Sequence, residues 1–442
     1  MPTKEELKAK VLKEIDSRRE EMIALAKTLL EMPQPGFREV KAAKVVSQKF
    51  TELGLAHKTG IAITGVKAVV SGGSVGPSVA VMGELDSLIV PDHPFANKTT
   101  GAAHACGHFA QGAMMYGVAA AITKPGILPS LAGKVVFIAM PAEEGIEVEY
   151  RYDLRKQGKL TYLTGKPEFI KLGELDDVNI VMMTHTSPKP EVKKLAMSES
   201  NNGVVRKKIQ FIGRSAHAGG NPHKGINALN AAMIALSAIH AQRETFQDND
   251  TIRVHPIITK GGDAVNAVPA DVRMESYVRG KNAPAIMDAN AKVDRALRAG
   301  AMAVGAKVRI TTIPGSMPLI PYPELWKIYR PNAVALVGEE EVGYVGHSTG
   351  SSDIGDVTQI MPAIHPYSGG TTGTEHGSDY LVQDYEVAVI NAAKAMAMTV
   401  IDLLADGAIK AKEVLAKSKP PMTKAQYLKS LDSLFKEEEY QG

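Results

Sequence analysis

Cysteine is almost absent from this chain of 442 residues, which contains a single one, Cys106. One cysteine cannot form an intrachain disulfide, whereas a secreted protein of this size often carries several. The scarcity favours a reducing compartment, and we expect the protein to be cytoplasmic. A chain of this length can bury a large core, so it does not need disulfides for stability.

Long apolar runs and clusters of one charge are also missing. The N-terminal sequence MPTKEELKAK has no apolar signal core, and longer apolar stretches are interrupted well before bilayer length. The net charge is +3, and the local basic excess at Lys410–Lys424 is typical of a solvated helical tail. We therefore expect neither a membrane span nor a nucleic-acid partner.

Short apolar runs and helical patterns alternate in the first part of the chain. Runs of strand type occupy residues 78–85, 134–141 and 178–184, and a helix of small residues is expected near 109–123. Continuous apolar strands that alternate with helices are typical of a mainly parallel α/β sheet covered on both faces.

The pattern changes after the polar, turn-prone segment ESNNG at 199–203. Strands are expected at 206–213, 252–260, 271–279 and 307–313, with helices at 225–242 and 284–303. This strand–helix–strand–strand–helix–strand order is that of a ferredoxin-like unit. The sequence therefore predicts an α/β protein with a discontinuous catalytic domain, residues 1–200 and 316–442, and an inserted domain, residues 201–315.

Polar clusters follow the apolar runs, where active sites of open α/β sheets are found. They are Glu84-Leu85-Asp86, His104-Ala105-Cys106-Gly107-His108, Pro141-Ala142-Glu143-Glu144-Gly145, Thr184-His185-Thr186 and, far downstream, His376 in GTEH.

Two of these clusters have the composition of a metal site. Cys106 and His108 flank one glycine, which lets both side chains reach one side of a turn. Thiolate, imidazole and carboxylate together suit zinc and also admit manganese or cobalt. The adjacent Glu143 and Glu144 would divide the work, one binding metal and the other taking a proton from water. The plainer alternative is that one carboxylate is exposed and the other caps a helix.

Taken together, these motifs resemble a known family. They are similar to the amidohydrolase branch of the dinuclear aminoacylase and carboxypeptidase superfamily, family twenty of the metallopeptidases. That branch includes hippurate hydrolase, indole-acetyl-amino-acid hydrolases and p-aminobenzoyl-glutamate hydrolase subunits. The matching segments are HACGH at 104–108, PAEEG at 141–145, GRSAHAGGNPHKGINAL at 213–229, GGDAVNAVPADV at 261–272, and GSSDIGDV followed by GTEH.

The resemblance implies a site and an assembly. It implies two divalent ions per subunit, Zn or Mn, about 3.5–4 Å apart. The implied metal ligands are Cys106, His108, Glu144, His185 and His376, with Glu143 as general base and Asp86 orienting a ligand. The inserted domain would be a lid and dimerisation domain of a homodimer or higher homo-oligomer. Its His217 would stabilise the oxyanion in the partner's site, and Asn266 and Arg279 would bind polar groups or a carboxylate of a small-molecule substrate.

The chain departs from the family pattern in three places. Phe109 follows HACGH where many relatives have an acidic or amide residue. The segment around His185 reads MMTHTSP, where the family usually has glycine-leucine-histidine. Glu84 stands where peptidase branches carry a histidine ligand. The first two departures concern the substrate pocket more than the metal site.

The leading hypothesis is a metal-dependent hydrolase that cleaves the amide of an aromatic or N-acyl amino acid. One alternative keeps the chemistry but removes an aromatic amine as ammonia, as 5-nitroanthranilate aminohydrolase does. A second alternative is a non-catalytic metal-binding subunit, and a third is a cysteine nucleophile at Cys106 paired with histidine.

Overall fold

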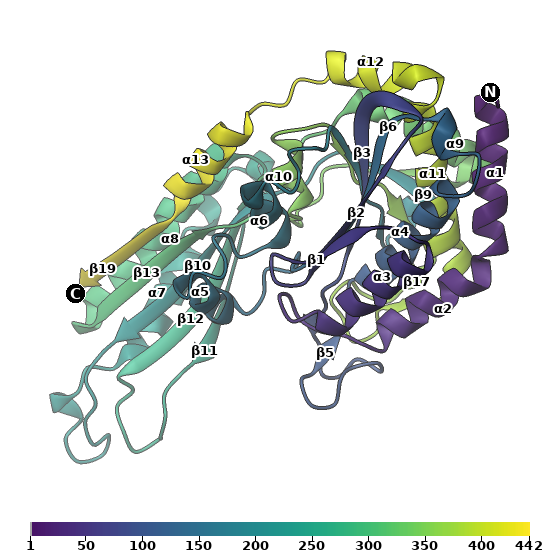
Figure 1. The fold of residues 1–442 in the computed structure, drawn as a ribbon. Helices are drawn as coiled ribbons and strands as arrows, with labels where there is room; N and C mark the ends of the chain where they lie inside the picture. The colour runs from purple at the N-terminus through teal and green to yellow at the C-terminus, as the bar shows by residue number, and fades with distance from the viewer. Residues whose placement is uncertain (1) are drawn as a thin grey trace.

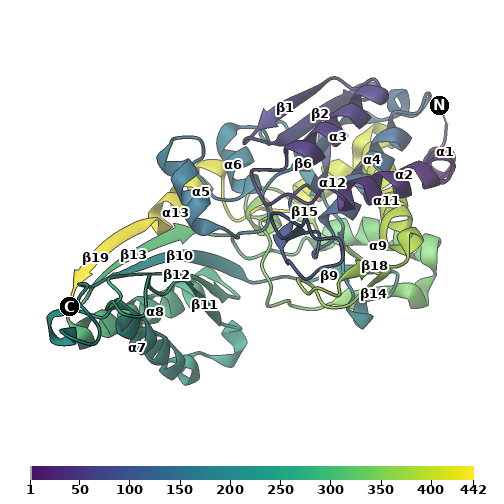
Figure 2. The same cartoon turned by 90° about the horizontal axis from the view of Figure 1, so that it is seen from below.

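The computed structural model describes residues 2–442, which form two parts, each built on its own sheet (Figure 1). The larger part contains the N-terminus, and the second part is an elongated body beside it. The chain crosses from the first part to the second and returns, so the second part is an insertion. Its position beside the first part is also clear from below (Figure 2).

The larger part is organised around a six-stranded sheet of order β1-β2-β6-β3-β7-β15. Its strands are β1 (His57–Ile61), β2 (Gly65–Ser71), β6 (Ala132–Met140), β3 (Ser74–Glu84), β7 (Ile180–Met182) and β15 (Ala363–Ile364). β6, β3, β7 and β15 are parallel neighbours, whereas β1 and β2 pair antiparallel at one edge. The prediction of a mostly parallel α/β sheet is confirmed.

Alternate side chains of the central strands enter two different cores, as expected for a sheet buried on both faces. On β3, Val79 and Val81 point into one core, and Ala80 and Met82 into the other. The first core is covered by α1 (Lys4–Ser17), α2 (Arg19–Leu30), α3 (Val40–Glu52), α4 (His108–Ile122), α9 (Pro323–Val337), α11 (Ala392–Leu404) and α12 (Ile409–Lys417). The second is covered by α6 (Gly165–Leu172), α10 (Ile354–Thr358) and α13 (Lys424–Leu434).

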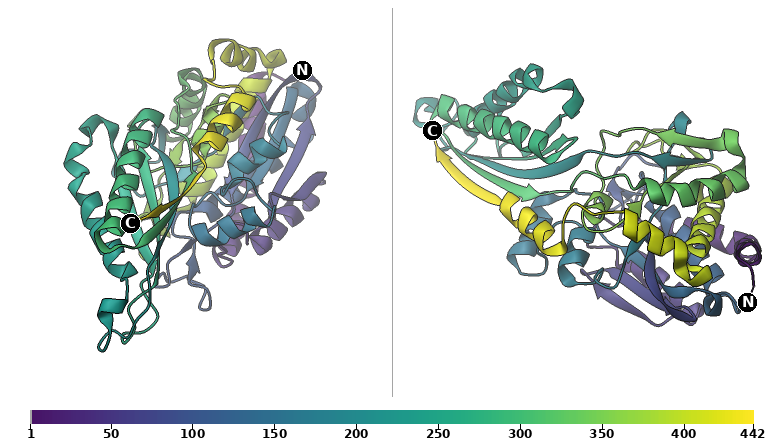
Figure 3. Two further views of the ribbon diagram at one scale, coloured as in Figure 1. Left: turned by 90° about the vertical axis from the view of Figure 1, so that its left-hand side faces the viewer. Right: turned by 90° about the horizontal axis from the view of Figure 1, so that it is seen from above.

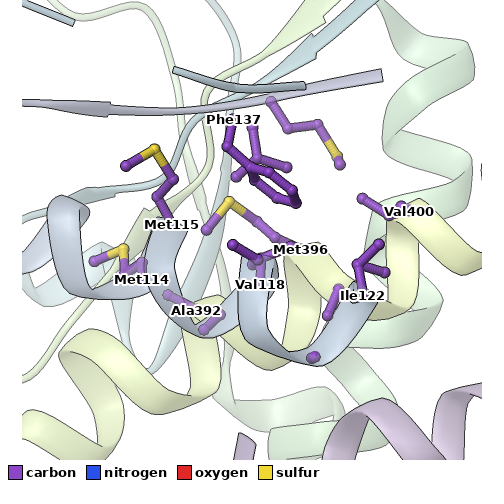
Figure 4. Packing of buried hydrophobic residues seen from close by; sticks show 14 of the residues in the cluster. Met114, Met115, Val118, Ile122, Phe137, Ala392, Met396 and Val400 are labelled. Carbon is purple, nitrogen blue, oxygen red and sulfur yellow. The ribbon is translucent and has the colours of Figure 1, made fainter. Parts of the chain in front are cut away.

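Helix α4 is buried along its whole length. It packs on the sheet beside α11, where Met115 and Val118 lie near Phe137 and Met396 (Figure 4). The segment Glu386–Leu404, a π-helical turn followed by α11, is long and apolar enough to cross a membrane, but 83% of its apolar window is buried inside the protein. Its apolar character is therefore explained by its place in the core.

The inserted part is an antiparallel five-stranded sheet of order β11-β12-β10-β13-β19. It contains β10 (Gly203–Ile212), β11 (Arg253–Lys260), β12 (Asp271–Gly280), β13 (Lys307–Pro314) and β19 (Lys436–Gln441), with α7 (Ala228–Ala241) and α8 (Ala283–Val304) on one face. The chain order β10-α7-β11-β12-α8-β13 is the predicted ferredoxin-like order. We call this part the lid.

The last strand differs from the sequence-based grouping, which places residues 316–442 with the first domain. After α12, the chain crosses to α13 and then runs along the lid, where β19 pairs with β13 (Figure 3). The C-terminal segment therefore contacts both parts of the molecule. The domain boundaries at 200/201 and 315/316 stay a prediction.

Smaller elements complete the larger part. A four-stranded sheet has the order β14 (Val342–Val345), β9 (Leu195–Ser198), β16 (Tyr367–Ser368) and β8 (His185–Thr186). Two short hairpins pair β4 (Leu88–Ile89) with β5 (Ala102–Ala103) and β17 (Thr371–Thr372) with β18 (Leu381–Val382). Helix α5 (Val148–Lys156) lies beside the lid strand β10.

Candidate metal centre

The polar clusters noted in the sequence meet at one edge of the larger sheet. β3 ends at Glu84, which is in register with Met140 at the end of the parallel strand β6, and β7 lies on the other side of β3. Because parallel strands end at the same edge, the segments that follow them lie close together. This brings Asp86, Glu143, Glu144 and His185 into one region.

A glycine turn adds Cys106 and His108 to this region. Gly107 has φ +86°, and a Cβ atom there would lie 2.0 Å from Thr186 Oγ1. Only glycine fits this position without displacing its neighbour. The turn leads directly into α4, whose first residue is His108, so the buried helix holds the turn in place.

The side chains form two donor groups that share Cys106. One group contains Cys106, His108 and His185, and the other contains Cys106, Glu144 and His376. Within each group the ligand atoms all lie within 4.8 Å of one another. Cys106 Sγ is 3.4 Å from His185 Nε2, and Glu144 Oε1 is 3.4 Å from His376 Nε2. The arrangement suits two cations that share one thiolate.

Hydrogen bonds orient the histidine rings toward the shared cysteine. The Nδ1 atom of His108 lies 3.0 Å from the Asp86 carbonyl oxygen and 3.1 Å from its carboxylate, and His185 Nδ1 lies 2.6 Å from the Thr186 carbonyl oxygen. Since these oxygens only accept, Nδ1 carries the proton and Nε2 keeps its lone pair for a ligand. Asp86 also accepts a hydrogen bond from the Glu144 backbone, 2.9 Å long, so it positions two donors at once.

The ionisation of Cys106 and its neighbours is shifted by their mutual charges. Burial and Glu144 raise the pKa of the Cys106 thiol, but His185 and His108 outweigh them and lower it to about 6. Glu144 raises the pKa of His376 to about 12 despite the opposing effect of burial. Within residues 2–442, His108 Nε2 and Glu144 Oε1 are buried without a hydrogen-bond partner. A thiolate, a carboxylate and an unpartnered imidazole nitrogen close to one another fit divalent cations.

Glu143 differs from its neighbour. Burial, reinforced by Glu84 and Glu144, raises the pKa of its carboxyl group well above the usual range. Its side chain lines the cavity next to the donor groups. A carboxylate with a high proton affinity beside a cation site has the properties of a proton acceptor.

A cavity of about 320 Å³ opens over these residues. It is lined by Cys106, Glu143, Glu144, His185 and His376 from the larger part and by Arg206, Tyr277 and Arg279 from the lid. His365 and Tyr367 complete the wall beside His185. The cavity therefore lies between the metal-type donors and the lid sheet.

Sequence reasoning missed Arg206, Tyr277 and His365. His365 directly follows β15, so the rule that polar residues at strand ends form sites could have found it. No sequence pattern marks Arg206 and Tyr277, because they lie in the middle of lid strands. The loop that they face across the cavity is distant from them in sequence.

Arg206 is the most informative of these residues. It is 4% exposed, and its Nε and Nη1 atoms have no hydrogen-bond partner in the described part of the chain. Its guanidinium lies against Gly145, where a Cβ atom would approach Arg206 Nε to 2.3 Å. Tyr277, which pairs with Arg206 across β10 and β12, donates a hydrogen bond to the Gly145 carbonyl oxygen. The lid thus contacts the PAEEG loop directly through a buried, unpaired cation.

His217 and Asn266 lie elsewhere. Both are exposed on lid loops that meet each other: His217 forms a bridge with Ala267, and the Ala218 backbone donates to the Asn266 carbonyl oxygen. Among residues 2–442, the cavity lining includes Arg279 but neither His217 nor Asn266. Of the three lid residues predicted, the structure brings only Arg279 to the centre of its own chain.

Comparisons with known proteins agree with this architecture. The profile of the peptidase dimerisation domain matches residues 200–303. The chain is 30% identical to Xaa-Arg dipeptidase of Mus musculus over 313 residues, covering 68% of this chain and 67% of that protein. It is 23% identical to IAA-amino acid hydrolase ILR1-like 4 of Arabidopsis thaliana, covering 79% and 77%.

Solved structures share the fold. A dinuclear metal-binding peptidase of the M20 family from Bacillus subtilis superposes with a TM-score of 0.64 at 22% identity, covering 88% of this chain and 99% of that one. Both the larger part and the lid therefore occur together in a known architecture.

Proposed function

Because the chain belongs to the M20 family of metal-dependent amidohydrolases and peptidases, we propose that it cleaves the amide bond of an N-acyl or aromatic amino acid. The observation that carries this proposal is the pair of donor groups sharing Cys106, with Glu143 in the same cavity. Hydrolysis of an amide needs an activated water and a proton carrier, and these residues supply the setting for both.

In this proposal Cys106, His108 and His185 hold one divalent cation, and Cys106, Glu144 and His376 hold the other. The cations would polarise the scissile carbonyl group and lower the pKa of water. Glu143 accepts the proton of the attacking water and then delivers it to the leaving nitrogen. Asp86 keeps His108 and the Glu144 backbone in place.

The substrate carries a carboxylate that faces the lid. Arg206 and Arg279 line the same cavity, and their guanidinium carbons lie 5.9 and 5.3 Å from the centre of the Tyr277 ring. Burying a guanidinium without a partner is costly, and an incoming carboxylate would satisfy its N–H groups in pairs. The lid wall therefore favours an anionic end of the substrate, opposite the donor groups that hold the scissile bond.

The carboxylate assignment is tested with N-benzoylglycine and its neutral carboxamide. Arg206→Met should lower kcat/KM for the acid by roughly 10- to 100-fold and leave the carboxamide less affected, since a charge-assisted bond is lost only with the acid. Arg273→Met is the matched control, because Arg273 lies on the same sheet face but pairs with Asp271 and Glu149. Equal losses for both compounds would contradict the assignment.

The cavity is completed by a second copy of the chain in this proposal. His217 and Asn266 project from the lid loops, where they are free to reach a neighbouring subunit. His217 would donate a hydrogen bond to the oxyanion of the partner's substrate, and Asn266 would bind its polar groups.

The first experiment is metal analysis paired with activity. The purified protein should contain about two divalent ions per chain, lose activity on chelation and regain it on adding Zn²⁺ or Mn²⁺. A panel of N-acyl amino acids, p-aminobenzoyl-glutamate and 5-nitroanthranilate identifies the branch. Release of an amino acid supports the proposal, release of ammonia from 5-nitroanthranilate overturns the amide assignment, and activity indifferent to chelation overturns the centre itself.

A further inference from the structure

A buried lysine lies directly behind the candidate metal centre. Lys166 is the second residue of α6, and its side chain is 0% exposed. Its ammonium contacts Glu84 Oε1 at 2.5 Å and also contacts Asp353 Oδ1. The Lys166 backbone N–H donates to Asp353 Oδ2 at 3.0 Å. The Asp353 carboxylate therefore binds both the first turn of α6 and the ammonium group of Lys166.

The carboxylates around this ammonium would suit a cation. Glu84, Glu143 and Asp353 offer carboxylate oxygens that all lie within 4.8 Å of one another, and Lys166 contacts two of the three residues. Several carboxylates brought together out of water repel one another strongly unless positive charge lies between them. Here the protein supplies that charge from its own chain.

Glu84 connects the lysine to the metal-type donors. Its Oε2 atom accepts a hydrogen bond from Gln111 Nε2 at 2.8 Å and lies 3.1 Å from His108 Nε2. His108 Nε2 has no hydrogen-bond partner in the described chain despite this short distance. The Glu84 carboxylate therefore lies directly beside the free imidazole nitrogen of a proposed ligand, at the edge of the candidate centre. Lys166 and Gln111 hold Glu84 in that position.

We propose that Lys166 is a positioning residue whose ammonium serves as a built-in cation of the centre. The ammonium occupies the cation position among Glu84, Glu143 and Asp353. It also pairs with Glu84 Oε1 and thereby holds the Glu84 carboxylate beside His108. This inference rests on the proposed metal centre but adds a residue and a role outside the ligand set. The Lys166 ammonium thereby keeps the cluster of Glu84, Glu143 and Asp353 from binding a further divalent ion.

A purely structural ion pair is the competing explanation, and the chain contains a matched example. Lys207 in the lid is also 0% exposed on its side chain, and it pairs with Asp294 on α8 at 2.5 Å. That pair joins β10 to α8 in the lid interior, on the face opposite Arg206. Removing either ammonium leaves a buried carboxylate uncompensated and destabilises the fold, but only Lys166 should affect metal binding.

The test uses Co²⁺ alone as a spectroscopic probe, with no substrate present. Lys166→Met should bind one further Co²⁺ per chain relative to the unsubstituted protein, with a changed d–d absorption spectrum. Lys207→Met should keep the original Co²⁺ content and spectrum while losing thermal stability. An unchanged Co²⁺ content together with an unchanged spectrum in Lys166→Met overturns the proposal.

A second variant covers the case in which Lys166→Met does not fold. Lys166→Met combined with Asp353→Asn removes one positive and one negative charge, so the balance of the cluster is kept. It should bind the original number of Co²⁺ ions but with a changed spectrum, because Glu84 is no longer held by the lysine. A spectrum identical to that of the unsubstituted protein overturns the positioning role. Co²⁺ binding without hydrolysis of any amide would overturn the proposed function but leave this test intact.

Discussion

Glu143 and Glu144 are neighbours in the chain, but their carboxyl groups have opposite surroundings. The Glu144 carboxylate faces His376 and His108, and its pKa is lowered because these groups outweigh the effect of burial. The Glu143 carboxyl group faces Glu84 and Asp353 in addition to Glu144, and its pKa is raised by burial and by these charges. One residue is therefore suited to stay ionised as a ligand and the other to carry a proton.

This difference leads to a prediction for Glu143→Ala. Turnover should fall by about 10²- to 10⁴-fold because the proton acceptor is removed, while the divalent metal content stays unchanged because no ligand is lost. Metal analysis and single-substrate kinetics on the same preparation check both points. The comparison variant is Glu144→Ala, which should lose metal as well as activity. Loss of both metals from Glu143→Ala would count against its assignment as the base.

Glu39 gives a pH-dependent prediction away from the donor groups. Burial and the nearby Asp86 raise the pKa of its carboxyl group to about 7, although Thr64 and the Ala142 backbone donate hydrogen bonds to it. The folded state therefore holds this proton more tightly than the unfolded chain, whose glutamates titrate near pH 4.3. The free energy of unfolding should fall as the pH rises from about 4.5 to 7, by up to about 3 kcal/mol from this group.

Glu39→Gln tests this linkage, since an amide can accept from Ala142 and donate to Thr64 without carrying charge. The variant should match the unsubstituted protein near pH 4.5 and exceed its free energy of unfolding by about 1–3 kcal/mol at pH 8. Denaturant unfolding of metal-free protein at several pH values measures the difference. A difference that does not change with pH would rule out the titration of Glu39 as its cause.

At the scale of elements, sequence reasoning worked where one signal was strong. The apolar runs predict β3, β6 and β7, and the periodic lid segments predict β10 to β13 with α7 and α8. It failed for β19, whose sequence KEEEYQ has few apolar residues. That strand is held by pairing with β13 and by ion pairs from Glu439 to Lys307 and Arg309. The local pattern of apolar and polar residues does not predict a strand that is formed by such long-range pairing.

The pairing of β19 predicts the effect of removing it. Deletion of residues 436–442 exposes the β13 edge and breaks the contacts of Glu438 and Glu439 with Arg298, Lys307 and Arg309. The free energy of unfolding should fall by about 1–3 kcal/mol, and aggregation should increase because an unpaired strand edge templates other chains. Calorimetry and light scattering measure these changes.

The control is Glu439→Gln, which keeps the strand but removes its charge. It should lower the free energy of unfolding much less than the deletion does, because exposed ion pairs contribute little. A deletion that unfolds like the full chain would show that β19 adds nothing to the lid.

At the scale of the whole molecule, the family-like motifs contain the residues that the structure brings together in the two donor groups, and their role as metal ligands stays a prediction. Lys166 and Arg206 could not be assigned from sequence, since their roles depend on Glu84 and Gly145, which are distant from them in the chain. Contacts of this range exist only in the folded chain.

The lid has an open sheet edge with exposed apolar residues. β11 is an edge strand, and its Ile257 and Ile258 are 51% and 41% exposed, while Met233 on α7 is 55% exposed. The opposite edge of the same sheet is covered by β19. Exposed apolar residues on an open sheet edge favour pairing with another chain, which agrees with the match of residues 200–303 to a peptidase dimerisation domain.

The proposal that His217 acts in a partner's cavity is decided by mixing two inactive variants. Glu143→Ala lacks the base, and His217→Ala lacks the exposed lid histidine, so each homodimer should be inactive. A mixed dimer contains one complete site, formed by Glu143 of one chain and His217 of the other. Since random pairing makes half of the dimers mixed, co-expression should restore about a quarter of the original activity if both chains are equally abundant. If His217 acted within its own chain, both sites of the mixed dimer would be incomplete and the mixture would stay inactive.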